Sequence, residues 1–250
     1  MNDLAWQAWL VIVLALAAGG LTKGLTGLGL PGIAVPIMAA FLGVEQSVMI
    51  MLLPAVTTNL WLLWRLRDCY GEVPEVPRVA VGGVPGVALG AAVLYLASDR
   101  FLSTLLALWV FVYLAVRYLH PQMSLTRPAR FRLAAPVGFA SGILQGATGI
   151  CVPVLVPYLD AIGASPRTYV FALAAVFLSL ALTHLVFLLA LQAYTPLLFG
   201  QSLLAVVPAM VFVPVGDWLR QFIRPRHFTV LIRVVLFVTA ARLLYGAWSG

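Results

Sequence analysis

Charged side chains are scarce in this chain, and acidic ones are the scarcest. Lys, Arg, Asp and Glu together make up 9% of the 250 residues, whereas ordinary soluble domains hold roughly 25%. Cysteine is limited to Cys69 and Cys151, which form neither a disulfide framework nor a metal-ligand pattern. Long polar segments are also missing between the apolar ones, which argues against the soluble domain that a scaffold or assembly factor would need.

Apolar residues fill most of the chain, at 63% of the sequence. Runs near the ~20 residues needed to cross hydrocarbon occur at 46–64, 79–97, 101–119, 169–191, 198–219 and 228–246. Two further apolar stretches, 4–43 and 133–163, are too long and too rich in glycine for one straight helix each. We therefore expect an all-α polytopic membrane protein. Its net charge of +7 lies between the spans, where it sets orientation and does not call for nucleic acid as a partner.

The sequence repeats itself. The segment "GLTKGLTGLGLP" (20–31) aligns with "FASGILQGATGICVP" (139–153), which sets Lys23 opposite Gln145. Further along, "GGVPGVALG" (82–90) falls on "AVVPAMVFV" (205–213), and 99–116 falls on 225–242. We expect an internal duplication with a first repeat at 1–119, a basic linker at 120–132 and a second repeat at 133–250.

The distribution of arginine indicates how the repeats are oriented. If each glycine-rich stretch crosses once, the repeats are parallel and the arginines divide between both sides of the membrane. If each is a re-entrant hairpin, three crossings remain per repeat, the repeats are inverted, and most arginines gather on one face. The loops on that face are 65–78, 120–133, 164–168 and 220–227. We expect this face to be cytoplasmic, with both termini outside.

The hairpin tips are the expected functional site. Irregular backbone in hydrocarbon is tolerated only where protein or a water-filled cavity satisfies its polar groups. Tips at Gly24–Gly29 and Gly146–Val152 would enter from opposite faces, meet near the midplane and build one shared site. The helix after each tip begins with a proline and presents unpaired N–H groups, a positive dipole end that favours an anion.

Lys23 is the one cation at this depth, and a buried lysine needs a cavity or a partner. The candidate carboxylates Glu45, Asp160 and Asp217 are expected at other depths, so an anionic ligand is the better partner. Two alternatives stay open: the glycines serve close helix packing, or Lys23 extends to an interface.

The expected substrate-binding residues combine the tip glycines, their threonine hydroxyls, the prolines and the Lys/Gln pair: Lys23, Gly24, Thr26, Gly27, Gly29, Pro31, Gln145, Gly146, Thr148, Gly149 and Pro153. Asn59 and His184 are candidates for the transport path or for a proton relay. We expect no metal and no cofactor.

The two tip sequences, "GLTKGLTGLGLPGIAVP" and its weaker echo "GILQGATGICVPVLVP", resemble the TauE/SafE sulfite-exporter family of membrane permeases over essentially the whole chain. The resemblance implies transport of small sulfur-containing or organic anions across a bacterial inner membrane, with the glycine-rich motifs as the binding region. Both termini would then be periplasmic.

The expected function is therefore a secondary transporter that moves a small anion, such as sulfite, a sulfonate or a sulfoacetate-like compound, across the membrane. A facilitator without proton coupling is the first alternative, and a homodimer is left open. An intramembrane enzyme is disfavoured, because His120, His184 and His227 lie far apart, although a pairing of Ser141 with His184 is not excluded.

Overall fold

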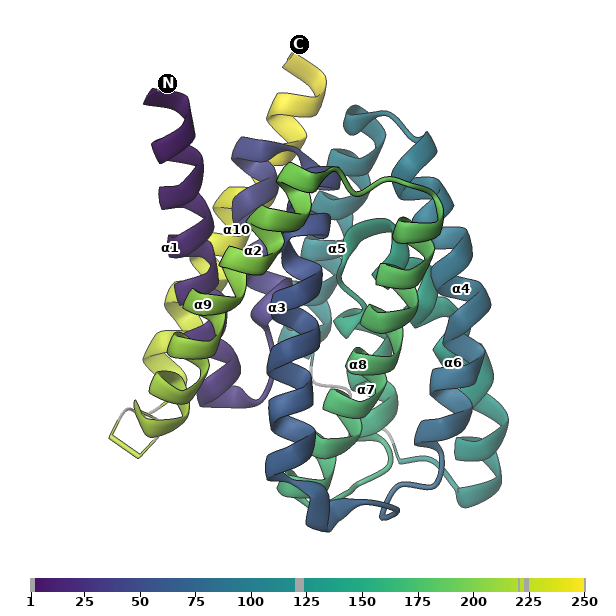
Figure 1. Cartoon of the computed structure of the whole chain (residues 1–250). Coiled ribbons are helices and arrows are strands. Elements are labelled where there is room, and N and C mark those ends of the chain that lie inside the picture. Colours follow the sequence, from purple (N-terminus) through teal and green to yellow (C-terminus); the bar gives the residue numbers. More distant parts are fainter. Residues whose placement is uncertain (1–2, 120–123, 220, 223–224, 250) are drawn as a thin grey trace. The chain divides into compact units, whose positions relative to one another are not determined.

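The structure, a computed structural model, describes residues 3–119, 124–219, 221–222 and 225–249 and is all-helical over them (Figure 1). The helices are α1 (Asp3–Thr26), α2 (Leu30–Leu42), α3 (Val44–Arg65), α4 (Val76–Leu96), α5 (Asp99–Leu119), α6 (Arg127–Thr148), α7 (Val152–Asp160), α8 (Pro166–Ala190), α9 (Pro196–Leu219) and α10 (Pro225–Ser249). A single 3-10 turn, η1 (Arg67–Cys69), lies in the loop before α4.

These helices follow the apolar runs of the sequence. Among the described residues, α1, α3, α4, α8 and α9 are long and apolar enough to cross a membrane. The chain is a multi-pass membrane protein. α6 begins at Arg127, inside the segment expected as a linker, because Pro128 suits the first turn of a helix. Residues 120–123 of that linker, and parts of the expected loop 220–227, lie outside the described residues.

Each glycine-rich stretch forms two helices joined by a short turn. α1 and α2 pack against each other, and so do α6 and α7. A Cβ at Gly19 would lie 2.7 Å from the Leu30 carbonyl oxygen, so α2 turns back along α1 from its first residue. Both expected breaks are therefore present as helical hairpins.

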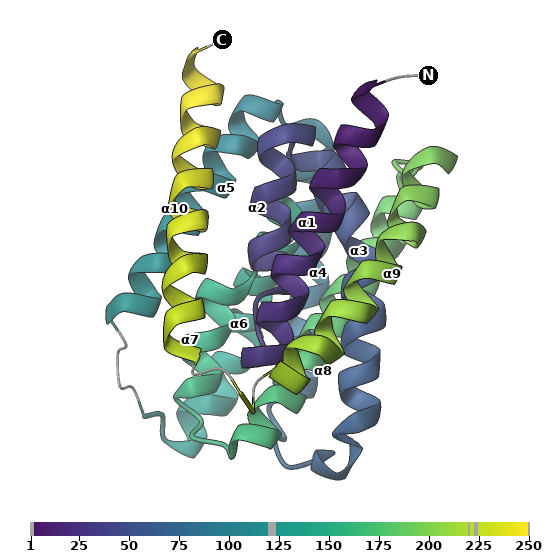
Figure 2. The ribbon, with the colours of Figure 1, turned by 90° about the vertical axis from the view of Figure 1, so that its left-hand side faces the viewer.

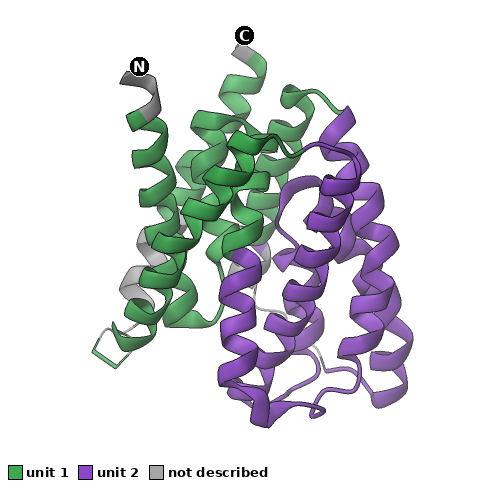
Figure 3. Cartoon of the chain, in the orientation of Figure 1, with its two compact units in different colours: residues 1–54, 97–114, 194–250 green, residues 55–96, 115–193 purple. Residues whose placement is uncertain are grey.

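The described helices group into two compact units (Figure 3). Unit 1 comprises residues 1–54, 97–114 and 194–250, and unit 2 comprises residues 55–96 and 115–193. Unit 1 thus joins the hairpin α1–α2 of the first repeat to α9 and α10 of the second. Unit 2 joins the hairpin α6–α7 of the second repeat to α4 of the first. The packing units differ from the sequence repeats because each hairpin packs on a helix from the other repeat.

Glycines permit the close packing of α1 on α9 in unit 1. A Cβ on Gly24 would lie 2.2 Å from the carbonyl oxygen of Val213, and one on Gly216 would lie 2.4 Å from that of Leu21. Backbone therefore meets backbone between α1 and α9, which run side by side (Figure 2). Small residues are the usual means of such close packing in membranes.

Unit 2 has the same contact between α4 and α6. A Cβ on Gly86 would lie 2.1 Å from the Phe139 carbonyl oxygen, and one on Gly146 would lie 2.6 Å from that of Val87. Gly146 therefore meets Val87 as Gly24 meets Val213, although the sequence comparison had paired Val213 with Gly90. The expected register of these two spans was wrong by three residues (90 minus 87), because the spans share few letters to align.

Gly86→Ala tests whether this contact holds unit 2 together. We expect it to lower the free energy of unfolding by about 1–3 kcal/mol, since the added methyl meets rigid backbone. Gly200→Ala in α9 is the matched control, because a Cβ there has nothing within 4 Å. Denaturant titration of the purified protein measures both, and equal stabilities would refute the packing role.

Candidate functional site

The first tip is a turn held by Thr26. Gly27 has a φ of 78°, and its N–H donates to the Lys23 carbonyl at 2.7 Å. The Thr26 hydroxyl oxygen accepts from the N–H of Leu28 at 3.2 Å and lies 2.8 Å from the Thr22 carbonyl, to which it donates. The positive φ explains the glycine, because other residues rarely adopt this conformation.

The second tip repeats these bonds. Gly149 has a φ of 71°, and its N–H donates to the Gln145 carbonyl at 2.9 Å. The Thr148 hydroxyl accepts from the N–H of Ile150 at 3.4 Å and donates to the Leu144 carbonyl at 2.8 Å. The two tips thus share the Thr–Gly turn, and they differ at the cap of the next helix, where Gly29 has a φ of 107° and Cys151 a φ of −113°.

The threonine hydroxyls were expected to donate to the anion. A hydroxyl has one proton, and Thr26 and Thr148 each place theirs on a carbonyl of their own helix. In this structure they therefore hold the turn in shape. Direct contact of Thr26 or Thr148 with substrate stays a prediction.

Each tip leads into the start of a helix. Pro31 and Pro153 stand in the first turn of α2 and α7, as expected, and neither N-cap residue, Gly29 or Cys151, caps the helix with its side chain. The first N–H groups of both helices thus lack side-chain caps in buried surroundings. Such groups carry partial positive charge and are costly to bury without an acceptor.

The tip glycines divide into two kinds. Gly27, Gly29 and Gly149 adopt positive φ and form the turns themselves. Gly24 and Gly146 lie one turn earlier and press against α9 and α4. Gly24 and Gly146 therefore serve close helix packing, as the first alternative stated, and a binding role for them stays a prediction.

Lys23 and Gln145 occupy matching positions one turn before each tip, and both are buried, at 4% and 5% exposure. Lys23 lies in the last turn of α1, where the negative end of the helix dipole favours a cation. Its burial argues against extension to an interface. Asp217 was expected at a different depth from Lys23. This was wrong, because the Asp217 backbone N would lie 2.5 Å from a Cβ on Gly24, the residue that follows Lys23.

The other expected polar residues are buried as well. Asn59 in α3 is 2% exposed and His184 in α8 is fully buried. Both ring nitrogens of His184 and the hydroxyl of Ser141 lack a hydrogen-bond partner among the described residues. No hydrogen bond therefore joins Ser141 to His184, and that pair does not form an activated nucleophile.

Sequence reasoning overlooked a polar cluster in the loop before α4. Arg167 pairs with Asp68 at 2.8 Å, the Thr168 hydroxyl donates to Glu72, and Glu75 is 3% exposed. The sequence feature that could have revealed this cluster is the segment "DCYGEVPE" at 68–75, which holds three acidic residues. These contacts tie the loop to the start of α8 and form no group of three or more metal-ligating side chains among the described residues.

Apolar helices of spanning length, two of them interrupted near buried polar residues, define a polytopic membrane protein. The chain belongs to the family described as Sulfite exporter TauE/SafE, whose family model matches residues 11–243. This confirms the resemblance seen in the tip sequences. Comparisons with curated proteins and with solved structures gave no match.

Thr148→Val tests the turn. We expect it to cost about 1–3 kcal/mol of unfolding free energy, since it leaves the N–H of Ile150 buried without a partner, while Thr148→Ser stays near wild type. Thr183→Val is the matched control, because Thr183 bonds only the Ser179 carbonyl within its own helix. A cost at Thr148 no larger than at Thr183, by denaturant titration, would contradict this role.

Proposed function

We propose that this protein is a secondary transporter for a small anion, most suitably a sulfur oxyanion or sulfonate, in the inner membrane of a bacterium. The observation that carries the proposal is the repeated tip: two equivalent turns, each leading into an uncapped helix start with buried surroundings. Membership of the Sulfite exporter TauE/SafE family supports the same substrate class.

The chemistry of the tips favours a negative ligand. The N–H groups at the starts of α2 and α7 can donate to oxygens that replace part of an anion's hydration shell. Lys23, one turn before the first tip, would supply positive charge, and Gln145 would supply a neutral amide at the matching position. An oxyanion with several acceptor oxygens suits several separate donors better than a halide does.

We further propose that the repeats are inverted and that both tips contribute to one site near the midplane. The equivalent contacts of Gly24 and Gly146, together with the matching Thr26 and Thr148 turns, support the duplication. The bound anion would be exposed alternately to either side. Export of one negative charge from a negative interior is favourable by about 2.3 kcal/mol per 100 mV, so the membrane potential alone can drive it.

Lys23→Gln tests the charged step. We expect sulfite binding by the purified protein, measured by calorimetry, to weaken at least tenfold, while Gln145→Ala weakens it less because no charge is lost. Sulfite uptake into proteoliposomes should fall in parallel. Wild-type affinity in Lys23→Gln would reassign Lys23 to structure and remove the charged step from the mechanism.

A charge exchange then tests whether the tips share one ligand. In the double variant Lys23→Gln with Gln145→Lys, a single shared site keeps one lysine and should recover at least part of the lost affinity. Two independent sites would show no recovery at the first tip. Sulfate, chloride and taurine serve as comparison ligands, and no binding of any anion would overturn the proposed function.

Topology is tested with single cysteines at the ends of the two hairpins. Phe41→Cys ends the first hairpin and Ala164→Cys follows the second; the native Cys69 and Cys151 are buried. We expect a membrane-impermeant maleimide to label Phe41→Cys in cells with a permeable outer membrane, and Ala164→Cys only after the inner membrane is opened. Labelling of both from the same side would mean parallel repeats.

A further inference from the structure

The chain passes from one packing unit to the other after Pro54, Leu96, Leu114 and Ala193. Two of these crossings, after Leu96 and after Ala193, lie in the connections between helices, and the one after Leu114 lies close to the end of α5. The crossing after Pro54 is different, because it lies in the middle of the 22-residue helix α3. Any movement of one unit relative to the other must therefore bend α3.

A proline interrupts the hydrogen bonding of α3 at this crossing. Pro54 has no N–H, so the Ile50 carbonyl, four residues earlier, lacks its usual donor within the helix. Helices bend sharply at such positions, because one bond is missing and the proline ring pushes the preceding turn away. A carbonyl left without any donor inside a membrane would be costly. The break therefore needs a donor from outside α3.

Two hydroxyls of unit 1 hold the broken turn. Ser202 in α9, which is fully buried, donates to the Ile50 carbonyl at 3.0 Å and accepts from the Leu53 N–H at 3.3 Å. The Tyr194 hydroxyl donates to the Met49 carbonyl at 2.5 Å. All five residues belong to unit 1. The backbone of α3 thus has side-chain partners up to the residue before Pro54.

The same bonds fix a second crossing. Tyr194 is the first residue of unit 1 after the helix α8, and its ring packs edge-on to that of Phe199, with 6.2 Å between the ring centres. Gln192, two residues earlier, has a φ of 54° and is the one non-glycine residue with a positive φ in the described part of the chain. Few residues with side chains adopt this conformation. Tyr194 therefore ties the crossing after Ala193 to the turn of α3 that precedes Pro54.

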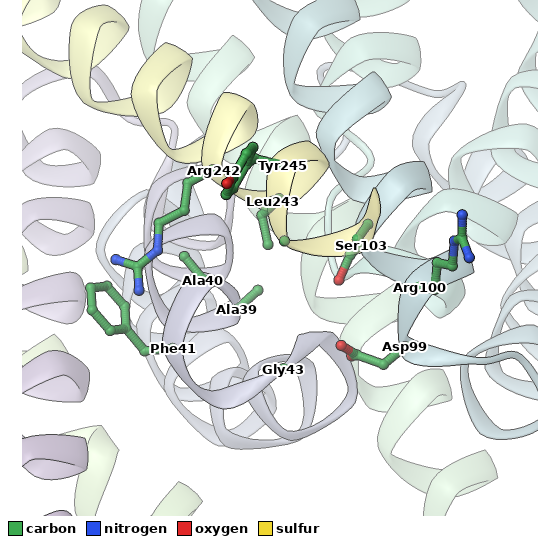
Figure 4. Close-up of a pocket in the computed structure, with 12 residues that line it drawn as sticks. Ala39, Ala40, Phe41, Gly43, Asp99, Arg100, Ser103, Arg242, Leu243 and Tyr245 are labelled. Carbon is green, nitrogen blue, oxygen red and sulfur yellow. The ribbon is translucent and has the colours of Figure 1, made fainter. Parts of the chain in front are cut away.

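The crossing after Leu96 is anchored in unit 1 as well. Asp99, in the first turn of α5, accepts from the Val44 N–H at 3.2 Å, and Figure 4 shows it beside Gly43. Val44 is the first residue of α3. Unit 1 thus holds the start of α3 through Asp99 and its break through side chains of α9 and of the loop before it. Because the first half of α3 is fixed, bending is confined to the break.

We propose that the break at Pro54 is a hinge about which the two units move when the bound anion is exposed first to one side and then to the other. The hinge thus rests on the function proposed for the tips. Hinges are commonly a few residues that absorb a large change in backbone torsions, and Pro54 and Gln192 are two such residues at neighbouring crossings. The hydroxyls of Ser202 and Tyr194 keep the α3 carbonyls satisfied on the side of unit 1.

Electron-spin distance measurements test the hinge without any substrate. Nitroxides are attached to Leu14→Cys in unit 1 and Leu89→Cys in unit 2; both side chains are more than half exposed, whereas the native cysteines are buried. In lipid nanodiscs we expect a distance distribution at least twice as wide as for Leu14→Cys with Leu108→Cys, a pair within unit 1. Pro54→Ala, which restores the missing N–H, should narrow it to the width of the within-unit pair.

Transport separates the hinge from binding. In proteoliposomes we expect Pro54→Ala to slow sulfite uptake at least tenfold, while the sulfite Kd measured by calorimetry stays within twofold of wild type. Pro208→Ala is the matched control, because Pro208 also lies inside a helix, α9, but one that belongs wholly to unit 1. It should keep both the wild-type uptake and the wild-type distance distribution.

The hinge and the proposed function fail in different ways. Equal widths for the two label pairs in the wild-type background, or wild-type uptake in Pro54→Ala, would overturn the hinge. The first of these results needs no proline variant, so it stands even if Pro54→Ala does not fold. Absence of sulfite binding and uptake in wild type would instead overturn the proposed function, and the distance distributions alone would then decide whether α3 bends at Pro54.

Discussion

The need to satisfy backbone polar groups without water governs this molecule. A helix interrupted inside hydrocarbon exposes N–H and C=O groups that lipid cannot satisfy. At both tips the chain meets this need in the same way: a glycine in the left-handed region donates its own N–H back to the helix, and the N–H of the next residue donates to the threonine hydroxyl. The start of each following helix has no side-chain cap, and its first turn contains a proline, which lacks an N–H.

Close packing supports the tips from the side. α1 and α9, like α4 and α6, touch through backbone because glycines stand at the contacts. Because the glycine surfaces of each hairpin fit a span from the other half of the chain, each packing unit combines helices from both halves.

Much of the fold was predictable from the sequence, because apolar runs mark spans and Gly–Pro clusters mark breaks. The breaks, the proline-led helix starts and the family follow from the letters at 20–31 and 139–153. The role of Thr26 was not predictable, since a hydroxyl that bonds its own turn and one that faces a ligand have the same sequence. The partner of each glycine was also hidden, because Gly24 meets Val213 across most of the chain. Asp217 was misplaced for the same reason.

Because each unit combines helices from distant stretches of the chain, the two units can be completed only in a certain order during synthesis. Unit 2 takes its helices from residues 55–96 and 115–193, so all its parts exist once the chain has reached Ala193. Unit 1 needs α9 and α10, so α1 has to wait for a partner that lies about 170 residues further along the chain (Asp3–Thr26 against Pro196–Leu219). Contacts between segments so far apart in sequence form slowly. During that interval the glycine-lined face of α1, which later meets α9, is open to lipid or to the insertion machinery, which makes α1 the segment most exposed to mispairing.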